Sequence, residues 1–341
     1  MTEPTTPVPS DGPTEPSSES PFPERVNLDA LHDAANDLRD QLGDVIVGQQ
    51  SFIEQLMIAL FSGGHVLIEG VPGVAKTLTA NALARAVDID FQRIQFTPDL
   101  MPSDVLGTPI FNPQEKQFTF RKGPIFAQCV LIDEINRAPA KTQAALFEVM
   151  EEQQVTVDGT TYPMAQPFFV IATQNPLEHE GTYRLPEAQL DRFMLKINVE
   201  YPSVEEETDI LQRHLGASSS SLLGSVTPVV DGEAVETHRD TVRQVRVAPE
   251  VVAYIARLMH ATREHAALTL GGSPRASVML LYSARARAAL HGRDYVSPED
   301  LQALAAPVLR HRIMLTPDQE MEGRTPDDLV HRIVQQVEVP Q

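Results

Sequence analysis

A glycine-rich turn between an apolar run and a lysine-threonine pair constrains the fold of this chain more than any other segment. Residues 66–68 are apolar and predict a buried strand, and residues 70–77 follow them, reading GVPGVAKT. Backbone N–H groups in such a turn form a nest for anions, and the helix beginning near Lys76 adds the positive end of its dipole. Lys76 can reach β- and γ-phosphates, and the Thr77 hydroxyl can ligate Mg²⁺. The segment therefore predicts a phosphate-binding loop in an α/β sheet.

One position departs from the usual pattern of such loops. The pattern G-x-x-x-x-G-K-[ST] has glycine where this chain has Ala75. A methyl group is the smallest possible departure, and Gly70 and Gly73 remain to let the backbone turn. The alternative interpretation is a Gly/Pro turn that happens to precede lysine and threonine, and the segments downstream argue against it.

A second apolar run ends in two carboxylates. Residues 129–134 read CVLIDE, and four apolar residues without alternation are typical of a strand buried on both faces. Carboxylates at the C-terminal end of such a strand face the crevice in which α/β sheets bind ligands. Asp133 would hold Mg²⁺, and Glu134 would polarise the attacking water as general base. A strand that ends in solvated acids is common, but its place after a phosphate loop favours the catalytic interpretation.

Three further polar residues follow in the chain. The apolar run 168–173 predicts a third strand, and Asn175 just after it could orient a water beside a γ-phosphate. Taken alone, its Asn-Pro dipeptide is only a turn signal. Arg192 and Arg275 come later, and each by itself is more typical of a surface ion pair than of catalysis.

In this order the motifs resemble those of the MoxR branch of the AAA+ ATPases. They are VGQ at 47–49, GVPGVAKT, VLIDEINRAP, IATQNP, LPEAQLDRF and GSPRAS, and the resemblance covers residues 28–325. The variant with Ala75 before the lysine is usual in that branch. The resemblance implies an AAA+ P-loop NTPase domain, an α/β fold with a parallel sheet and flanking helices, followed by a small all-helical lid domain.

The resemblance also implies the roles of individual residues. Lys76 and Glu134 would be catalytic, and Asn175 would be sensor 1. Arg192 would be the arginine finger donated to a neighbouring subunit, and Arg275 would be sensor 2, reaching the nucleotide from the lid. The implied nucleotide-binding residues are Val47, Gly48, Gly70, Val71, Pro72, Gly73, Val74, Ala75, Lys76, Thr77, Leu78 and Asp133, with Thr77 and Asp133 as metal ligands. Because Arg184 stands where proline is expected, whether it shares the role of Arg192 stays open.

Length and composition divide the chain. A chain of 341 residues suggests about two domains, and residues 1–24 are so rich in Pro, Ser, Thr and Glu that we expect a disordered tail. The expected parts are the nucleotide-binding domain at 25–200, an insertion at about 98–127, a hairpin at about 152–164, a helical lid at 201–325 and a C-terminal tail at 326–341. The serine-rich segment 217–225 predicts a flexible connection. The resemblance implies that the insertion can face the central pore of a ring; the alternative is a decorative edge.

The charge of the chain excludes some partners. Its formal net charge is -20, from 47 acidic and 27 basic residues, which argues against a sequence-independent grip on nucleic acid and against docking on anionic lipid. The single cysteine, Cys129, predicts a small buried hydrophobe and no disulfide framework. We find neither an apolar stretch of about 18 residues nor a signal peptide, so we expect a cytoplasmic protein without stable membrane insertion.

These features together predict an ATPase that uses ATP and Mg²⁺ in an oligomeric ring, which we expect to be a hexamer. The resemblance implies chaperone-like remodelling or activation of partner protein complexes, including partners with von Willebrand factor A domains. One alternative is a nucleotide-switched scaffold with little turnover, against which Glu134 argues because a switch needs no general base. Another is a nucleic-acid motor, against which the acidic charge argues.

Overall fold

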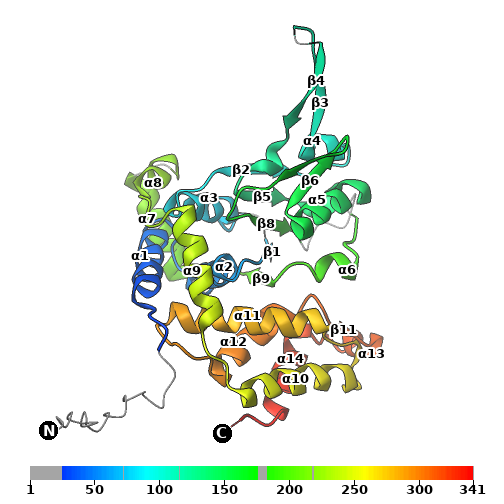
Figure 1. The fold of residues 1–341 in the computed structure, drawn as a ribbon. Helices are drawn as coiled ribbons and strands as arrows, with labels where there is room; N and C mark the ends of the chain where they lie inside the picture. Colours follow the sequence, from blue (N-terminus) through cyan, green and yellow to red (C-terminus); the bar gives the residue numbers. More distant parts are fainter. Residues whose placement is uncertain (1–24, 72, 115, 176–182, 217–218, 341) are drawn as a thin grey trace, which may run out of the picture.

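The computed structural model describes residues 25–71, 73–114, 116–175, 183–216 and 219–340 of the chain. The expected tail at 1–24 and Pro72 of the phosphate loop lie outside these ranges. Figure 1 shows an α/β body around a central sheet, a long hairpin that stands away from the body, and a layer of helices below the sheet.

The central sheet has five parallel strands in the order β2-β5-β8-β1-β9. They are β1 (Val66–Gly70), β2 (Phe91–Gln95), β5 (Cys129–Asp133), β8 (Phe169–Gln174) and β9 (Leu195–Val199). Every residue of β5 is buried, as are the first five residues of β8. The apolar runs at 66–68, 129–134 and 168–173 therefore predicted β1, β5 and β8 correctly, because a strand covered on both faces cannot alternate apolar with polar residues.

Helices cover both faces of the sheet. Alternate residues of the inner strands divide between two apolar cores, with Leu131 and Ile171 on one side and Val130 and Val170 on the other. The first core also contains α1 (Asp29–Val45), α2 (Gln50–Ser62) and α3 (Lys76–Ala86), and the second contains α5 (Ala140–Glu152). Short elements complete this part of the chain: α4 (Pro102–Leu106), η1 (Pro124–Phe126), η2 (Ile135–Arg137) and α6 (Glu187–Leu190).

Two antiparallel hairpins are present, the second of which was expected at about 152–164. Strands β3 (Gly107–Asn112) and β4 (Gln117–Lys122) form the long hairpin at the top of Figure 1, inside the segment expected as an insertion. Strands β6 (Gln154–Val157) and β7 (Thr160–Pro163) form the second, which turns through Asp158 and Gly159, both with positive φ. The rings of Phe120 and Tyr162 stack with 4.5 Å between their centroids and join the two hairpins.

The C-terminal half is mostly helical, and it differs from expectation at two places. Its elements are α7 (Val204–Gly216), α8 (Ser219–Ser225), α9 (Gly232–Gln244), α10 (Pro249–Glu264), α11 (Pro274–Leu290), α12 (Pro298–Leu309), α13 (Pro317–Met321), α14 (Pro326–Gln336) and the short strand pair β10 (Leu268–Leu270) and β11 (Met314–Leu315). Residues 219–225, expected to be flexible, form α8. Residues 326–336, expected in a tail, form α14, which buries Leu329, Val330 and Ile333 and contacts α12.

The helices after β9 do not all lie together. In Figure 1, α7 and α8 lie beside α1 and α3 at the edge of the α/β body, whereas α10 to α14 form the layer below the sheet. The helix α9 runs between these two groups and contacts α2. The layer of α10 to α14 is the lid, and α2, β9 and α1 contact it directly.

Candidate functional site

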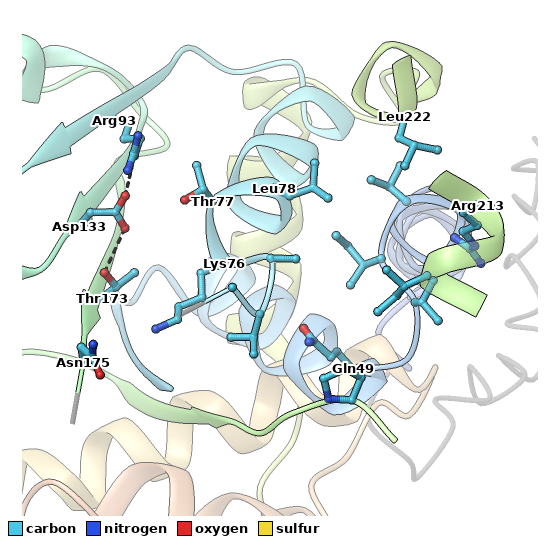
Figure 2. A pocket seen from close by; sticks show the side chains of 18 of the residues that line it. Gln49, Lys76, Thr77, Leu78, Arg93, Asp133, Thr173, Asn175, Arg213 and Leu222 are labelled. Atoms are coloured by element: carbon cyan, nitrogen blue, oxygen red, sulfur yellow. Dashed lines mark hydrogen bonds and ion pairs between the residues drawn. The ribbon is translucent and has the colours of Figure 1, made fainter. Parts of the chain in front are cut away.

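A cavity of about 620 Å³ opens at the C-terminal ends of the parallel strands. This volume lies within the range typical of small-molecule sites, about 300–1,000 Å³. Its walls come from the α1–α2 connection, the phosphate loop with the start of α3, the ends of β2, β5 and β8, and the helices α7 and α8. Figure 2 shows Lys76 and Thr77 pointing from α3 toward the strand ends, with Leu222 and Arg213 at the opposite end of the cavity.

The described residues of the phosphate loop turn sharply just before α3. Gly73 and Ala75 both have positive φ, +86° and +56°, and α3 begins at the next residue, Lys76. The left-handed conformation explains why glycine is usual at the position of Ala75, since a Cβ there costs about 1–2 kcal/mol. The predicted loop residues that line the cavity are Gly73, Val74, Ala75, Lys76, Thr77 and Leu78. Gly70 ends β1, and Val71 packs against the apolar core.

Lys76 is folded back across the loop. Its Nζ donates a hydrogen bond of 2.5 Å to the carbonyl oxygen of Gly70. Burial lowers the pKa of the Lys76 ammonium, whereas the carboxylates of Asp133, Glu69 and Glu134 oppose this shift because they favour its charged form. The Lys76 ammonium is therefore a half-buried cation close to three carboxylates. A bound phosphate would replace the Gly70 carbonyl oxygen as its hydrogen-bond partner.

Asp133 belongs to a line of polar contacts that crosses three neighbouring strands. Its Oδ2 lies 2.5 Å from Nε of Arg93 on β2, and its Oδ1 accepts a 3.0 Å hydrogen bond from the Thr173 hydroxyl on β8. The backbone N–H of Glu134 donates to the same Thr173 oxygen at 3.1 Å. Sequence reasoning missed Arg93 and Thr173. The available signal was that each precedes a strand end that faces the predicted crevice.

Glu134 stands in an unusual backbone conformation. Its φ is +56°, and non-glycine residues in this region cost about 1–3 kcal/mol and gather at functional sites. Its Oε2 accepts a 2.9 Å hydrogen bond from Nη1 of Arg137, three residues later. Glu134 and Asn175 both line the cavity near Lys76, so the structure brings together the predicted phosphate, base and sensor residues.

The other end of the cavity is apolar. Val45, Ile46 and Val47 line it from the α1–α2 connection, and Ile210 and Leu222 line it from α7 and α8. The predicted Gly48 lies outside the lining, in a turn with φ of +64°, where an added Cβ would collide with the Glu206 side chain. Arg213 of α7 donates to the carbonyl oxygens of Gly43 and Asp44 at the end of α1, which fixes α7 over this end. An apolar slot beside a phosphate loop suits a flat heteroaromatic base.

The donor set at the strand ends fits a magnesium ion. Thr77 supplies a hydroxyl and Asp133 a carboxylate, which are the hard oxygen ligands that Mg²⁺ takes from a protein when phosphates complete its shell. Within the described part of the chain, no group of three or more His, Cys, Asp or Glu side chains could hold a metal by itself. The residues therefore fit an ion that arrives with a phosphate ligand.

The three predicted arginines do not reach this cavity. Arg192 and Arg275 both contact Glu151 outside this cavity. Arg275 was expected to extend from the lid into the cavity of its own chain, and it does not. Arg184 lines a smaller cavity of about 310 Å³ together with Lys196 and Arg310. Only the position of Arg275 differs from expectation, because Arg192 was expected to act on a neighbouring subunit.

The sheet order, the phosphate loop after β1, the acidic end of β5 and the lid define a nucleotide-binding protein of the AAA+ class. Residues 65–195 match the family described as "ATPase family associated with various cellular activities (AAA)", and residues 260–333 match the AAA lid domain. A crystal structure of a protein from Cytophaga hutchinsonii has the same fold, with a TM-score of 0.85 and 42% sequence identity over 92% of this chain and 97% of that one.

Two curated relatives define the family more narrowly. The chain is 45% identical to Chaperone MoxR1 of Mycobacterium tuberculosis over 87% of its own length and 80% of that protein. It is 30% identical to Protein MoxR of Methylorubrum extorquens over 90% of its own length and 96% of that protein. The chain therefore belongs to the MoxR family of AAA+ ATPases, as its motifs predicted. Along the described ranges, no helix is both long and apolar enough to cross a membrane.

Proposed function

We propose that this protein binds ATP with Mg²⁺ in the 620 Å³ cavity, hydrolyses it as a ring of identical subunits, and uses the cycle to remodel partner proteins. The observation that carries the proposal is that one cavity contains, from one end to the other, an apolar slot, a phosphate loop and the side chains proposed as catalytic. This arrangement matches the base, phosphates and reacting water of a nucleoside triphosphate.

Each part of the cavity has a task in this reaction. The loop N–H groups and Lys76 bind the phosphates, and Thr77 and Asp133 would hold Mg²⁺, which supplies neutralisation of the phosphate charge when bound. Thr173 fixes the Asp133 carboxylate and the backbone of Glu134 at the same time. Glu134 then accepts the proton of the attacking water, which Asn175 orients. Arg137 keeps the Glu134 carboxylate in place before the water arrives.

Among the described residues, no arginine of the same chain is placed in the cavity as a finger. Arg93 and Arg213 line it, but Arg93 is paired with Asp133 and Arg213 is bonded to the end of α1. An arginine that stabilises the transition-state charge is worth about 10³–10⁵ in rate. We therefore assign this task to Arg192 and Arg275 of an adjacent subunit, in a ring that we expect to be a hexamer, and expect an isolated subunit to be slow.

Remodelling a partner protein requires a surface that binds it, and the β3–β4 hairpin offers such a surface. Phe111 and Phe118 are 50% and 71% exposed, and their ring centroids lie 5.4 Å apart. The hairpin also carries Lys116, Arg121 and Lys122 on a chain whose net charge is -20. We propose that it contacts client proteins, and that partners with von Willebrand factor A domains are the first class to test.

Two substitutions separate phosphate binding from water activation. Lys76→Ala should abolish ATP binding in calorimetry, whereas Glu134→Gln should bind ATP and Mg²⁺ like the unchanged protein but lose phosphate release. Lys141→Ala, an exposed lysine on α5 outside the cavity, serves as the control and should behave like the unchanged protein. Equal loss of ATP affinity in the Lys76 and Glu134 variants would contradict the assignment.

The same variants decide between an ATPase and a nucleotide-switched scaffold. If the unchanged ring binds ATP but releases phosphate no faster than Glu134→Gln, the scaffold is the better description. The Glu134→Gln ring held in ATP is also the bait for identifying clients, because it should keep a bound partner that the active ring releases.

A further inference from the structure

Glu151, next to the last residue of α5, joins two arginines that come from different parts of the chain. Its Oε2 lies 3.0 Å from Nε of Arg192, which follows α6, and its Oε1 accepts a 2.7 Å hydrogen bond from Nη2 of Arg275 at the start of α11. Two guanidinium groups repel each other, and a carboxylate between them offsets that repulsion. One side chain of the α/β body therefore fixes an arginine of the body beside an arginine of the lid.

Both arginines have N–H donors that do not contact Glu151. Arg192 contacts Glu151 through its inner Nε, so its two Nη groups remain, and among the described residues they make no hydrogen bond or ion pair. The Arg192 and Arg275 side chains are 31% and 38% exposed. Guanidinium groups bind phosphate oxygens through pairs of parallel N–H donors. The two arginines can therefore bind a second, larger anion while Glu151 keeps its contacts with both of them.

A second set of contacts fixes the spacing between the two arginines. Asp191, which precedes Arg192, accepts hydrogen bonds from the Ser273 hydroxyl at 3.0 Å and from Nε of Arg312 at 2.7 Å. Ser273 caps α11 two residues before Arg275, and the Arg312 side chain is only 1% exposed. The loop of Arg192 and the first turn of α11 are thus one unit, prearranged before any ligand binds.

We propose that Glu151 is a positioning residue that holds Arg192 and Arg275 together as a two-arginine clamp for the γ-phosphate in the cavity of the neighbouring subunit. The proposal rests on the proposed ring ATPase, and it deepens that function because it makes the two arginines act as a pair. None of the three residues lines the nucleotide cavity of its own chain. Loss of Glu151 should therefore impair the neighbour's site and leave its own intact.

The first test compares Glu151→Ala with Glu152→Ala in the full-length ring. Glu152 is the adjacent exposed acid, and it makes no ion pair with any residue in the described part of the chain. Because small misplacement of a catalytic group costs up to about 100-fold, Glu151→Ala should lower kcat by about 10-fold or more. ATP affinity in calorimetry and ring size should not change, and Glu152→Ala should keep full turnover. Full turnover in Glu151→Ala would overturn the proposal.

Mixed rings show on which subunit Glu151 acts. Mixing Glu151→Ala with Lys76→Ala subunits should restore turnover, because sites then arise in which an intact cavity faces an intact clamp. Mixing Glu151→Ala with Arg192→Ala subunits should restore nothing, because both variants lack the clamp. If instead the mixture with Arg192→Ala recovers turnover and the mixture with Lys76→Ala does not, Glu151 supports the cavity of its own subunit and the proposal is wrong. Glu151→Gln, which keeps the shape of the side chain, repeats the series should the alanine variant fail to assemble.

A reference mixture separates this proposal from the function on which it rests. Mixing Arg192→Ala with Lys76→Ala subunits tests only whether an arginine acts between subunits. If this reference stays inactive although the subunits co-assemble, the ring mechanism itself is wrong. If the reference recovers turnover while the Glu151 mixtures follow the opposite pattern, only the role of Glu151 is wrong.

Discussion

Acid should weaken this protein through His65, a buried histidine at the N-terminal end of the sheet. His65 directly precedes β1, the strand that leads to the phosphate loop. Its Nδ1 accepts a 3.1 Å hydrogen bond from the backbone N–H of Val170, so its proton must be on Nε2, which lies 3.3 Å from the carbonyl oxygen of Met150. A second proton on Nδ1 would face the N–H of Val170. The folded structure therefore favours the neutral ring.

The structure sets the size and the direction of the effect. Burial lowers the pKa of His65 to about 4 from the ordinary 6.5, and the nearby Arg239 charge adds to this shift against the opposing bond to Met150. The folded state thus binds fewer protons than the unfolded state between pH 6.5 and pH 4. The free energy of unfolding should be unaffected by His65 above pH 6.5 and should fall by about 3 kcal/mol as the pH drops to about 4.

Urea unfolding at a series of pH values from 7 to 4 measures this contribution when the protein is compared with its His65→Gln variant. Glutamine can accept from Val170 and donate to Met150, but it does not titrate. His311 is also buried in the described part of the chain, but it is present in both proteins and its contribution cancels in the difference. The variant should lose less stability on acidification, by about 3 kcal/mol at pH 4. Parallel curves for the two proteins would refute the reasoning.

Two further substitutions test single structural features. Ala75→Gly should raise the free energy of unfolding by about 1 kcal/mol, because Ala75 has φ of +56° and glycine removes that strain; a lower value in urea unfolding would contradict this account. Asp300→Asn should lower it by about 3–5 kcal/mol, because the buried Asp300 carboxylate binds Arg287 and Arg293. The exposed Asp318→Asn is its control, and equal effects of the two on the melting temperature would argue against the buried pair.

The sequence predicted the centre of the site because chain order and burial determine it. Strands covered on both faces must be apolar runs, and the C-terminal ends of parallel strands meet at one edge. Lys76, Asp133, Glu134 and Asn175 each follow such a run, and the structure brings all four to one cavity. Arg93 escaped notice because a single arginine in an alternating strand is usually a solvated surface residue.

The helices α8 and α14 differ from expectation for different reasons. Residues 219–225 are rich in serine, which favours loops, but Leu222 and Leu223 pack against the apolar core and α8 forms. The helix α14 did carry local signals: Thr325 and Asp328 form a capping box with a proline between them, and apolar residues follow at helical spacing. The expected tail is therefore a helix over Pro326–Gln336.

The placement of Arg192 and Arg275 goes beyond what a single sequence can specify. A motif fixes which residue types are present, but it does not say whether an arginine serves its own chain or a neighbour. The contacts of Glu151 and Asp191 hold both arginines beside each other and outside the cavity of their own chain, which supports the proposal that they act on a neighbouring subunit. In the proposed ring, a lid tied to the loop of Arg192 in this way would couple any movement of the lid in one subunit to the transition-state charge in the next. The ring, and not the chain, would then be the unit whose nucleotide turnover can be regulated.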